Sequence, residues 1–373
     1  MTRVIDFPSS GDHRSVVASV LEASREGALV GLPCELGYVL AVSATHETAV
    51  RQLLQIANEL TARPILSLAH PEQLWDFVSD LSPMASRLVR RVWPGPVVAE
   101  FPSAGPWSGP PLAPSLAEFY RHQSLRCGSF HHPLQQMLAR AQQEPFLAVP
   151  VPAPGQKEWN AADGLELAQV WGDKVHLIVN AGFTTRPQTI TSVAFPENPP
   201  PAVNEIGSYS PEQIHRLMAQ LTLFVCTGNT CRSPMAEGMF RRLLCKRLEC
   251  TESELVTRGY LVASAGVAAT PGAPASRETL AILDQNGIDM SEHTSQQVTD
   301  QLMEWADLVL AMTDRHRSAI VQAFPEFAEK VERICPDGDI ADPYGGDHTV
   351  YAECSEQLRE CLEHWIELVI SDV

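Results

Sequence analysis

The sequence predicts a two-domain α/β protein, and three observations carry that prediction. The chain has 373 residues, which leaves room for about two domains of roughly 100–200 residues each. In the second half, apolar strand-like runs alternate with helix-like runs, which is typical of a doubly wound parallel sheet with helices on both faces. Between the halves, residues 197–205 form a proline-rich stretch, so we expect the domain boundary there.

The predicted domains are residues 1–205 and 221–373, joined by a linker helix within 206–220. The linker begins with Ser210-Pro211-Glu212 and continues with the apolar residues Ile214 and Leu217, which indicates a capped amphipathic helix. In the second domain the expected strands are 222–226, 259–264 and 307–312, and the expected helices are 234–248, 274–286, 314–323 and 350–370.

Composition and charge narrow the classes of function. The chain is 45% hydrophobic, an ordinary value for a globular protein, and no apolar run approaches the length of a membrane-spanning helix. The first residues lack the apolar core of a signal peptide, so we expect a cytoplasmic protein that does not bind membranes. The formal net charge is −18, most of it carried by residues 206–373. A chain without a basic surface is not expected to bind nucleic acid.

The cysteines and histidines give no metal signature. The nine cysteines are odd in number and irregularly spaced, which argues against a disulfide framework and against a zinc site. Cys354 and Cys361 share a helical spacing with apolar neighbours, so we expect them in the core. His131 and His132 have no carboxylate or cysteine at ligand spacing. We expect neither a metal nor another cofactor.

The most informative segment is a loop between a strand and a helix. The apolar run 221–225 is followed by Cys226-Thr227-Gly228-Asn229-Thr230-Cys231-Arg232-Ser233 and then by a helix-like run from Met235. This order predicts a strand, a phosphate-sized loop and a helix N-terminus. The amide groups of such a loop, with the dipole of the following helix, bind anions.

The residue types in this loop match the needs of phosphomonoester cleavage. The positive end of a helix favours the thiolate form of a cysteine, which makes Cys226 the expected nucleophile. Gly228 is expected to let the backbone turn its amides inward. Arg232 supplies a planar fork that can hold two phosphate oxygens.

The remaining loop residues are expected to support this chemistry. Ser233 can donate a hydrogen bond to the Cys226 sulfur, and Asn229 is expected to brace the loop. Thr227, Thr230 and Cys231 complete the expected phosphate-binding set. The alternative is a buried structural cysteine beside a surface arginine. The strand before the loop and the helix after it favour the catalytic interpretation.

Beyond the loop, residues 221–373 resemble the low-molecular-weight protein tyrosine phosphatase family. The resemblance continues through three later segments: Ser264-Ala265-Gly266, the histidine segment 287–293 and the strand 306–313. It is most telling in Ala341-Asp342-Pro343-Tyr344-Gly345-Gly346, which resembles the loop that carries the family's general acid. Without the family, Asp342 would be a turn aspartate before a proline.

The family resemblance implies a two-step hydrolysis through a cysteinyl-phosphate. Cys226 would attack phosphorus while Asp342 protonates the leaving group, and Arg232 would stabilise the transferred charge. Ser264, His293 and Tyr344 would support the site. The implied partner is a phosphorylated protein, and no metal is required.

Two details indicate the branch of the family. The bacterial protein arginine phosphatases have the same loop sequence as this chain and a similar acid loop. Thr230 stands where tyrosine-directed relatives carry a larger aliphatic residue such as isoleucine. The resemblance therefore implies hydrolysis of phosphotyrosine or phosphoarginine. The alternative of arsenate reduction needs relay cysteines just after the central strand, and residues 311–314 contain none.

The first half resembles the threonylcarbamoyl-AMP synthase family over residues 10–215. The resemblance lies in a glycine-flanked strand at 27–40, a helix at 49–55 and the segments 92–96, 125–127 and 175–193. Members of this family use ATP, threonine and bicarbonate. The fold implied is α/β, with a small-ligand site.

This domain departs from its family at the positions that should bind the nucleotide. The family's Thr-Glu-Thr is replaced by Cys34-Glu35-Leu36, and its basic pair falls on Ala57 and Glu59. Its Ser-Ala-Asn segment aligns with residues 149–152, whereas Arg126 and 191–193 match the family. We therefore expect a catalytically degenerate domain that could still bind a small ligand and regulate the phosphatase. An active synthase fused to the phosphatase is the alternative.

Overall fold

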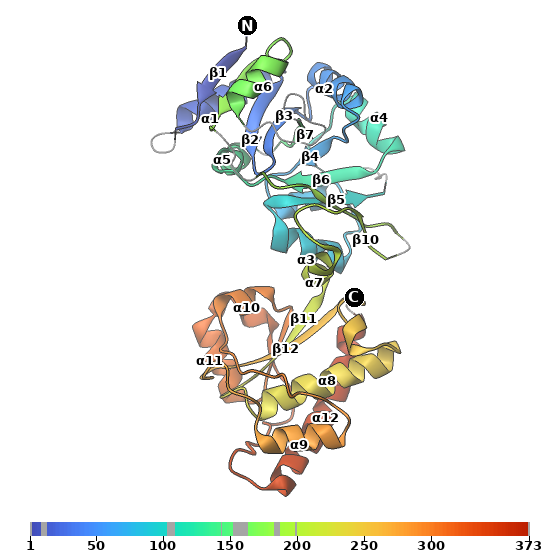
Figure 1. Cartoon of the computed structure of the whole chain (residues 1–373), viewed down its shortest axis with the longest axis vertical. Helices are drawn as coiled ribbons and strands as arrows, with labels where there is room; N and C mark the ends of the chain where they lie inside the picture. Colours follow the sequence, from blue (N-terminus) through green and yellow to red (C-terminus); the bar gives the residue numbers. More distant parts are fainter. Residues whose placement is uncertain are drawn as a thin grey trace. The chain divides into compact units, whose positions relative to one another are not determined.

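The computed structural model describes residues 2–8, 13–102, 109–142, 144–151, 163–182, 187–197 and 200–371. The chain forms two compact units, Met1–Ile214 and His215–Val373, drawn in Figure 1. Both are α/β, which confirms the expected fold class. Pro152 of the segment 149–152, and residues 198–199 of the expected boundary, lie outside the described residues.

In the first unit, the described strands form one mixed sheet. In the order in which they lie across it, they are β1 (Arg3–Asp6), β8 (Leu177–Asn180), β2 (Val30–Cys34), β3 (Gly37–Ser43), β7 (Phe146–Pro150), β4 (Ile65–Ser67), β6 (Leu125–Ser129), β5 (Gly95–Phe101), β9 (Thr191–Ala194) and β10 (Ala202–Glu205). The central strands are buried along their whole length, as expected for a sheet that is covered on both faces.

Amphipathic helices cover this sheet. They are α1 (Arg14–Arg25), α2 (Glu47–Glu59), α3 (Pro83–Val92), α4 (Pro114–His122), α5 (Pro133–Ala141) and α6 (Gly164–Trp171), with a short 3₁₀ helix, η1 (Pro71–Asp76). The helix expected at 49–55 is therefore α2. Its N-cap residue His46 accepts a hydrogen bond from the Ala49 amide.

The end of the first unit lies later than the proline-rich stretch. Residues 202–205 are the edge strand β10, which pairs antiparallel with β9. The amides of Gly207 and Tyr209 then donate to the Thr191 hydroxyl, at 3.2 and 3.0 Å. The two units divide within α7 (Pro211–Met218), the helix of the expected linker. The physical reason is that this stretch pairs with a strand instead of running free.

The second unit contains a parallel sheet with the order β12 (Tyr260–Gly266), β11 (Gln220–Cys226), β13 (Leu308–Ala311) and β14 (Val331–Arg333). β11 is central, pairs in parallel with β12 and β13, and is buried throughout. It begins two residues before the expected strand, inside the segment expected to be a linker helix.

Alternating side chains of β11 enter two different cores. Phe224 and Cys226 belong to a core that includes residues of α8 (Arg232–Leu248), α9 (Arg277–Gln285) and α12 (His348–Ser371). Leu223 and Val225 belong to a second core, shared with α10 (Asp300–Trp305) and α11 (Asp314–Ala323). Figure 1 shows these two helix groups on opposite sides of the sheet. The alternation confirms the doubly wound arrangement.

Short 3₁₀ helices and capping residues complete this unit. The short helices are η2 (Glu252–Glu254) and η3 (Pro325–Lys330). α9 and α11 each begin after a hydroxyl residue, Ser276 and Thr313, whose side chain accepts a hydrogen bond from the third helical amide. These caps explain why the two helices begin where they do.

One disulfide corrects the expectation, drawn from the number and spacing of the cysteines, that the chain has no disulfide framework. Cys335, just after β14, forms a disulfide with Cys361 of α12, whereas Cys354 is free and buried in the core. The bonded residues are 26 positions apart, and their proximity depends on how α12 packs, so cysteine spacing could not reveal it. None of the helices within the described ranges is both long and apolar enough to cross a membrane.

Candidate active site

The phosphate loop, defined here as residues 226–233, joins β11 to α8 at the carboxyl edge of the sheet. Cys226 is the last residue of the strand, and α8 begins at Arg232. The neighbouring strand β12 passes close beneath the loop. A Cβ atom on Gly266 would lie 2.4 Å from the Thr227 carbonyl oxygen, so this approach requires a glycine.

We expected Gly228 to make the turn of the loop, but Asn229 makes it. Asn229 has a φ of 56°, in the left-handed region that asparagine tolerates better than most residues. At Gly228, a Cβ atom would meet only the Thr230 hydroxyl, at 3.6 Å. The physical reason is that the buried Asn229 side chain makes enough hydrogen bonds to hold this backbone conformation.

Two polar groups of the loop lie against the Cys226 sulfur. The Asn229 amide donates to Sγ at 3.2 Å, and the Ser233 hydroxyl lies 3.0 Å from Sγ. Cys226 is 3% exposed and Ser233 is fully buried. These contacts hold the sulfur at the start of the loop, facing the Asn229 amide.

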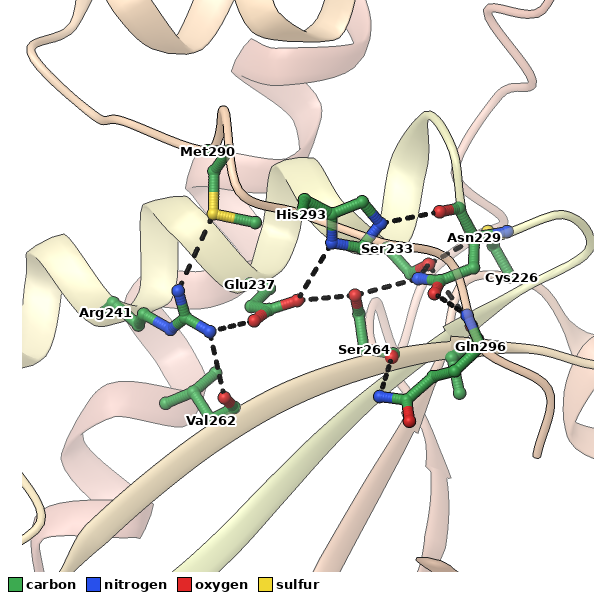
Figure 2. Close-up of polar contacts among 11 residues, drawn as sticks. Cys226, Asn229, Ser233, Glu237, Arg241, Val262, Ser264, Met290, His293 and Gln296 are labelled. Carbon is green, nitrogen blue, oxygen red and sulfur yellow. Dashed lines mark hydrogen bonds and ion pairs between the residues drawn. The ribbon is translucent and has the colours of Figure 1, made fainter. Parts of the chain in front are cut away.

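Asn229 connects the loop to the elements behind it, as Figure 2 shows. Its Nδ2 donates to the hydroxyls of Ser233 and Ser264, at 2.9 and 2.8 Å. Its Oδ1 accepts from the Gln296 amide at 2.9 Å. Its carbonyl oxygen lies 2.9 Å from His293 Nε2, which therefore carries the proton. The structure thus brings Ser264 and His293 to the back of the loop.

Glu237 is a member of this network that sequence reasoning missed. Its carboxylate accepts from the Ser264 hydroxyl at 2.5 Å, lies 3.9 Å from His293 Nδ1 and pairs with Arg241 (Figure 2). Glu237 is 5% exposed. Its position four residues after Ser233, one helical turn along the same face, was the available signal. Gln296 carried no comparable signal.

Arg232 lies almost completely buried at the start of α8. Its Nη1 donates to the Ile340 carbonyl oxygen at 3.2 Å, and its Nη2 donates to Asp342 Oδ2 at 2.7 Å. Its Nε is buried and, in the described part of the chain, has no hydrogen-bond partner. A buried donor of this kind suits an oxygen atom of a phosphate group.

Asp342 lies in the acid loop, defined as residues 340–346, and its side chain is 54% exposed. The loop is held from two sides. The Ile340 amide donates to the Met312 carbonyl at the end of β13, at 2.9 Å. Gln357 of α12 accepts from the Ala341 amide and donates to the Asp339 carbonyl, both at 3.2 Å. These contacts fix the backbone just before Asp342.

His316 is a second residue that the sequence did not indicate. Its Nε2 lies 2.8 Å from the Thr227 hydroxyl, and its Nδ1 lies 2.8 Å from the Thr313 hydroxyl. Burial, aided by the nearby Arg232 guanidinium, lowers the pKa of His316 to about 4. The ring is therefore neutral at physiological pH and positions Thr227 without adding charge to the loop.

The other predicted site residues lie either in the phosphate loop or at the exposed edge of the site. The Thr230 hydroxyl lies 3.7 Å from Cys231 Sγ, and the Cys231 sulfur lies 3.2 Å from the Tyr351 hydroxyl. Burial, followed by the contact with Cys231, raises the pKa of Tyr351 to about 12. Tyr344 is 80% exposed, and its amide donates to Asp342 Oδ1 at 3.3 Å.

In the first unit, Leu36, Arg126 and Pro150, which lie in three of the segments compared with the family's nucleotide site, line one cavity. Ala57 lies on the buried face of α2, and the Glu59 carboxylate pairs with the Lys174 ammonium group at 2.9 Å. Arg126 and Ser192 instead converge on Glu100: the Arg126 Nε and the Ser192 hydroxyl lie 3.0 and 2.5 Å from its Oε1.

Comparisons with known proteins match each unit to a family model. Residues 222–373 match the family described as low molecular weight phosphotyrosine protein phosphatase. Residues 22–205 match the Sua5, YciO and YrdC family, described as telomere recombination. Both matches confirm the resemblances seen in the sequence.

The second unit is similar to named bacterial phosphatases. It is 39% identical to a protein-arginine-phosphatase of Geobacillus stearothermophilus, over 39% of this chain and 93% of the relative. It is 38% identical to the protein-arginine-phosphatase of Bacillus subtilis, over 38% of this chain and 90% of the relative. A probable low molecular weight protein-tyrosine-phosphatase of Ralstonia nicotianae is 34% identical, over 40% of this chain and 95% of the relative.

Among solved structures, the low molecular weight protein tyrosine phosphatase from T. tengcongensis is 40% identical. The match covers 40% of this chain and 99% of that one, with a TM-score of 0.36. The identity to the two arginine phosphatases extends over nine-tenths or more of their length. Through residues 222–373 the chain therefore belongs to the low molecular weight phosphotyrosine protein phosphatase family and is a phosphoric monoester hydrolase.

Proposed function

We propose that this chain is a protein phosphatase that hydrolyses phosphoarginine in preference to phosphotyrosine, through a cysteinyl-phosphate on Cys226. The observation that carries the proposal is the arrangement at the loop. A buried cysteine sulfur accepts from a loop amide and lies against a serine hydroxyl. Beside it stands a buried arginine that has an unused donor and contacts a half-exposed aspartate. This arrangement supports the roles proposed for Cys226 as nucleophile, Arg232 as anion clamp and Asp342 as proton donor.

The proposed chemistry has two steps. In the first, the Cys226 thiolate attacks phosphorus, the bond from phosphorus to the leaving atom breaks, and Asp342 gives that atom its proton. In the second, Asp342 takes a proton from water, whose oxygen attacks phosphorus and releases Cys226. Arg232 and the loop amides stabilise the charge on the phosphoryl oxygens in both steps.

Two features support phosphoarginine as the substrate. The two relatives cited at 39% and 38% identity are named protein-arginine-phosphatases. Thr230 adds a hydroxyl and leaves more room than isoleucine beside the phosphorus, where a flat guanidinium would lie. Gly345 leaves the acid loop with one aromatic residue, Tyr344, and so with little surface for stacking a phenol.

Phosphotyrosine is the second candidate, favoured by the 34% identity to a probable protein-tyrosine-phosphatase. For the first unit we propose a binding or regulatory role, because its sequence lacks the basic pair and the Ser-Ala-Asn segment of the family's nucleotide site. The proposed setting is cytoplasmic, with phosphorylated proteins as partners.

The test is a side-by-side assay of the full chain on phosphoarginine- and phosphotyrosine-containing proteins, together with Cys226→Ser. Serine fits the site but is far less ionised at neutral pH, so we expect this variant to bind substrate without turning it over. The wild type should show the higher kcat/KM on phosphoarginine. Substantial turnover by Cys226→Ser would refute the nucleophile assignment, and a preference for phosphotyrosine would favour the second candidate.

A further inference from the structure

Tyr351 is a buried tyrosine that reaches the phosphate loop from the helix that follows the acid loop. It lies in the first turn of α12, which begins at His348, and its amide donates to the Asp347 carbonyl at 3.3 Å. Tyr351 is 2% exposed, in the core that α12 shares with α8. Its hydroxyl lies 3.2 Å from Cys231 Sγ. One side chain of α12 therefore touches the loop that holds the expected nucleophile.

Cys231 is the N-cap residue of α8, but its side chain does not cap the helix. The usual N-cap side chains are those of serine, threonine, aspartate and asparagine, which accept a hydrogen bond from a helical amide. The Cys231 side chain makes no such bond, and the residue is 5% exposed. Its sulfur is thus left to contact the hydroxyl groups beside it.

Two hydroxyl groups lie beside this sulfur, at different distances. The Tyr351 hydroxyl is at 3.2 Å and the Thr230 hydroxyl is at 3.7 Å. A thiol is a weak donor and a weak acceptor, so the nearer hydroxyl is its main partner. Burial, followed by the contact with Cys231, raises the pKa of Tyr351 to about 12, so the phenol keeps its proton at physiological pH. The sulfur is therefore held by Tyr351, and Thr230 makes only a long contact with it.

The backbone of Thr230 is fixed, so its side chain is the part that can respond to a change. The Ser276 amide, at the start of α9, donates to the Thr230 carbonyl at 2.8 Å. A threonine has alternative staggered rotamers about χ1, which point its hydroxyl in different directions. If the sulfur lost its nearer partner, the Thr230 hydroxyl would be the one beside it and would turn toward it.

We propose that Tyr351 is a positioning residue for substrate selection: by holding the Cys231 sulfur, it leaves the Thr230 hydroxyl available to the guanidinium group of phosphoarginine. This inference rests on the proposed preference for phosphoarginine and adds to it a residue from α12. The phenyl ring of phosphotyrosine offers the Thr230 hydroxyl no N–H group, so Tyr351 should affect its hydrolysis less.

The experiment measures one ratio on the full chain: kcat/KM on a phosphoarginine peptide divided by kcat/KM on the matched phosphotyrosine peptide. Tyr351→Phe removes the hydroxyl and keeps the ring in the core. It is made in the wild type and in two backgrounds, Thr230→Val and Cys231→Ala. Thr230→Val removes the threonine hydroxyl at nearly constant shape, and Cys231→Ala removes the sulfur that lies between the two hydroxyls.

Tyr260→Phe is the matched control. Tyr260 is a buried tyrosine of the same core, at the start of β12 and paired with Gln220 at the start of β11. It therefore lies at the end of the sheet away from the phosphate loop, and its replacement should leave the ratio unchanged.

We expect Tyr351→Phe to lower the ratio about fivefold in the wild type, mainly through slower phosphoarginine hydrolysis. In the Thr230→Val and Cys231→Ala backgrounds it should leave the ratio unchanged. The reason is that either the hydroxyl or the sulfur through which Tyr351 acts is gone, so the effects are not additive.

The outcomes separate this proposal from the proposed function. A wild type that prefers phosphotyrosine would overturn the proposed function and this proposal with it. A wild type that prefers phosphoarginine, with the same ratio in Tyr351→Phe, would overturn this proposal alone. So would an equal further fall in the Thr230→Val background, because the phenol would then act on the loop as a whole and not through the Thr230 hydroxyl.

Discussion

At the residue scale, the candidate site depends on side chains that each serve two neighbours. Asn229 turns the loop with its backbone and ties it to Ser233 and Ser264 with its amide group. Arg232 contacts both the acid loop and Asp342 while keeping one buried donor unused. Because these bonds preset the loop geometry, the site can stabilise charge without rearranging its dipoles during the reaction.

The proton-donor role of Asp342 predicts a dependence on the leaving group. Asp342→Ala should slow a substrate with a basic leaving group, such as an alkyl phosphate, far more than an activated aryl phosphate. The reason is that a good leaving group departs without a proton. The measurement is kcat for both substrates with both enzymes, and equal slowing of the two would remove Asp342 from this role.

The neutral His316 ring predicts a loss of stability in acid. Its pKa is about 4 in the folded protein, against an ordinary value of 6.5. Between these pH values the unfolded state binds a proton that the folded state does not, so stability falls as pH drops below about 6.5 and levels off below about 4. The difference corresponds to at most about 3 kcal/mol.

Two measurements check this expectation. The ring resonances of His316 should titrate in NMR near pH 4. The thermal midpoint of the second unit should fall less on acidification in His316→Gln than in the wild type. A His316 that titrates near its ordinary value would contradict the predicted neutral state.

Sequence reasoning reached some of these residues and not others, for physical reasons. The loop residues are contiguous, so their order alone indicated an anion site. Glu237 and His316 act through contacts between a helix and a loop, which form only when the sheet places α8 and α11 beside it. Asn229 was expected to brace the loop, but its left-handed turn was assigned to Gly228, because glycine is the usual residue for such a backbone.

At the element scale, α12 determines where the acid loop lies. Gln357 of this helix bonds the backbone on both sides of Ile340, and the disulfide from Cys361 holds Cys335 at the entry to the loop. The sequence predicted α12 from the helical spacing of its apolar residues. It could not predict these tethers, because they project from the helix toward a loop without regular structure.

The Gln357 contacts predict a positioning effect on Asp342. Gln357→Glu keeps an acceptor for the Ala341 amide but removes the donor to the Asp339 carbonyl and adds a charge. We expect about a tenfold loss of kcat with little change in KM, because the acid is displaced while the loop that binds phosphate is not. The alkaline limb of the pH profile of kcat/KM should also move upward, since an added carboxylate disfavours ionised Asp342, the form that cannot donate a proton.

Glu360→Gln provides the control, as an exposed substitution on the same helix. It should leave both kcat and KM unchanged. If Gln357→Glu behaved like this control, the acid loop would be positioned by its other contacts alone.

At the scale of the whole molecule, a phosphatase unit is fused to a unit that matches a different family model. The boundary was expected at the proline-rich stretch, but residues 202–205 of that stretch form β10 in the sheet of the first unit, and the units divide after Ile214. Proline-rich composition indicates an extended backbone and does not say whether a neighbouring strand will pair with it. The α/β class of the second unit followed from the alternation of strands and helices, and that of the first unit from its family resemblance.

The charge balance around Glu100 predicts that the full chain makes no threonylcarbamoyl-adenylate. With ATP, threonine and bicarbonate together, no pyrophosphate should be released above the rate seen when any one of the three is omitted. The reason is that Glu100 and Glu205 already compensate the arginines that would hold the triphosphate. Release that requires all three substrates would show that the first unit is an active synthase.

The central claim is that a cysteine phosphatase loop with Thr230 selects phosphoarginine, and one ratio tests it most directly. That ratio is kcat/KM on phosphoarginine divided by kcat/KM on phosphotyrosine, measured for wild type and Thr230→Ile. Isoleucine removes the hydroxyl and fills the space beside the phosphorus, so we predict at least about a tenfold fall in phosphoarginine hydrolysis, or roughly 1.4 kcal/mol. Phosphotyrosine hydrolysis should be unchanged or faster. An unchanged ratio would contradict the account and leave the chain among the general tyrosine phosphatases.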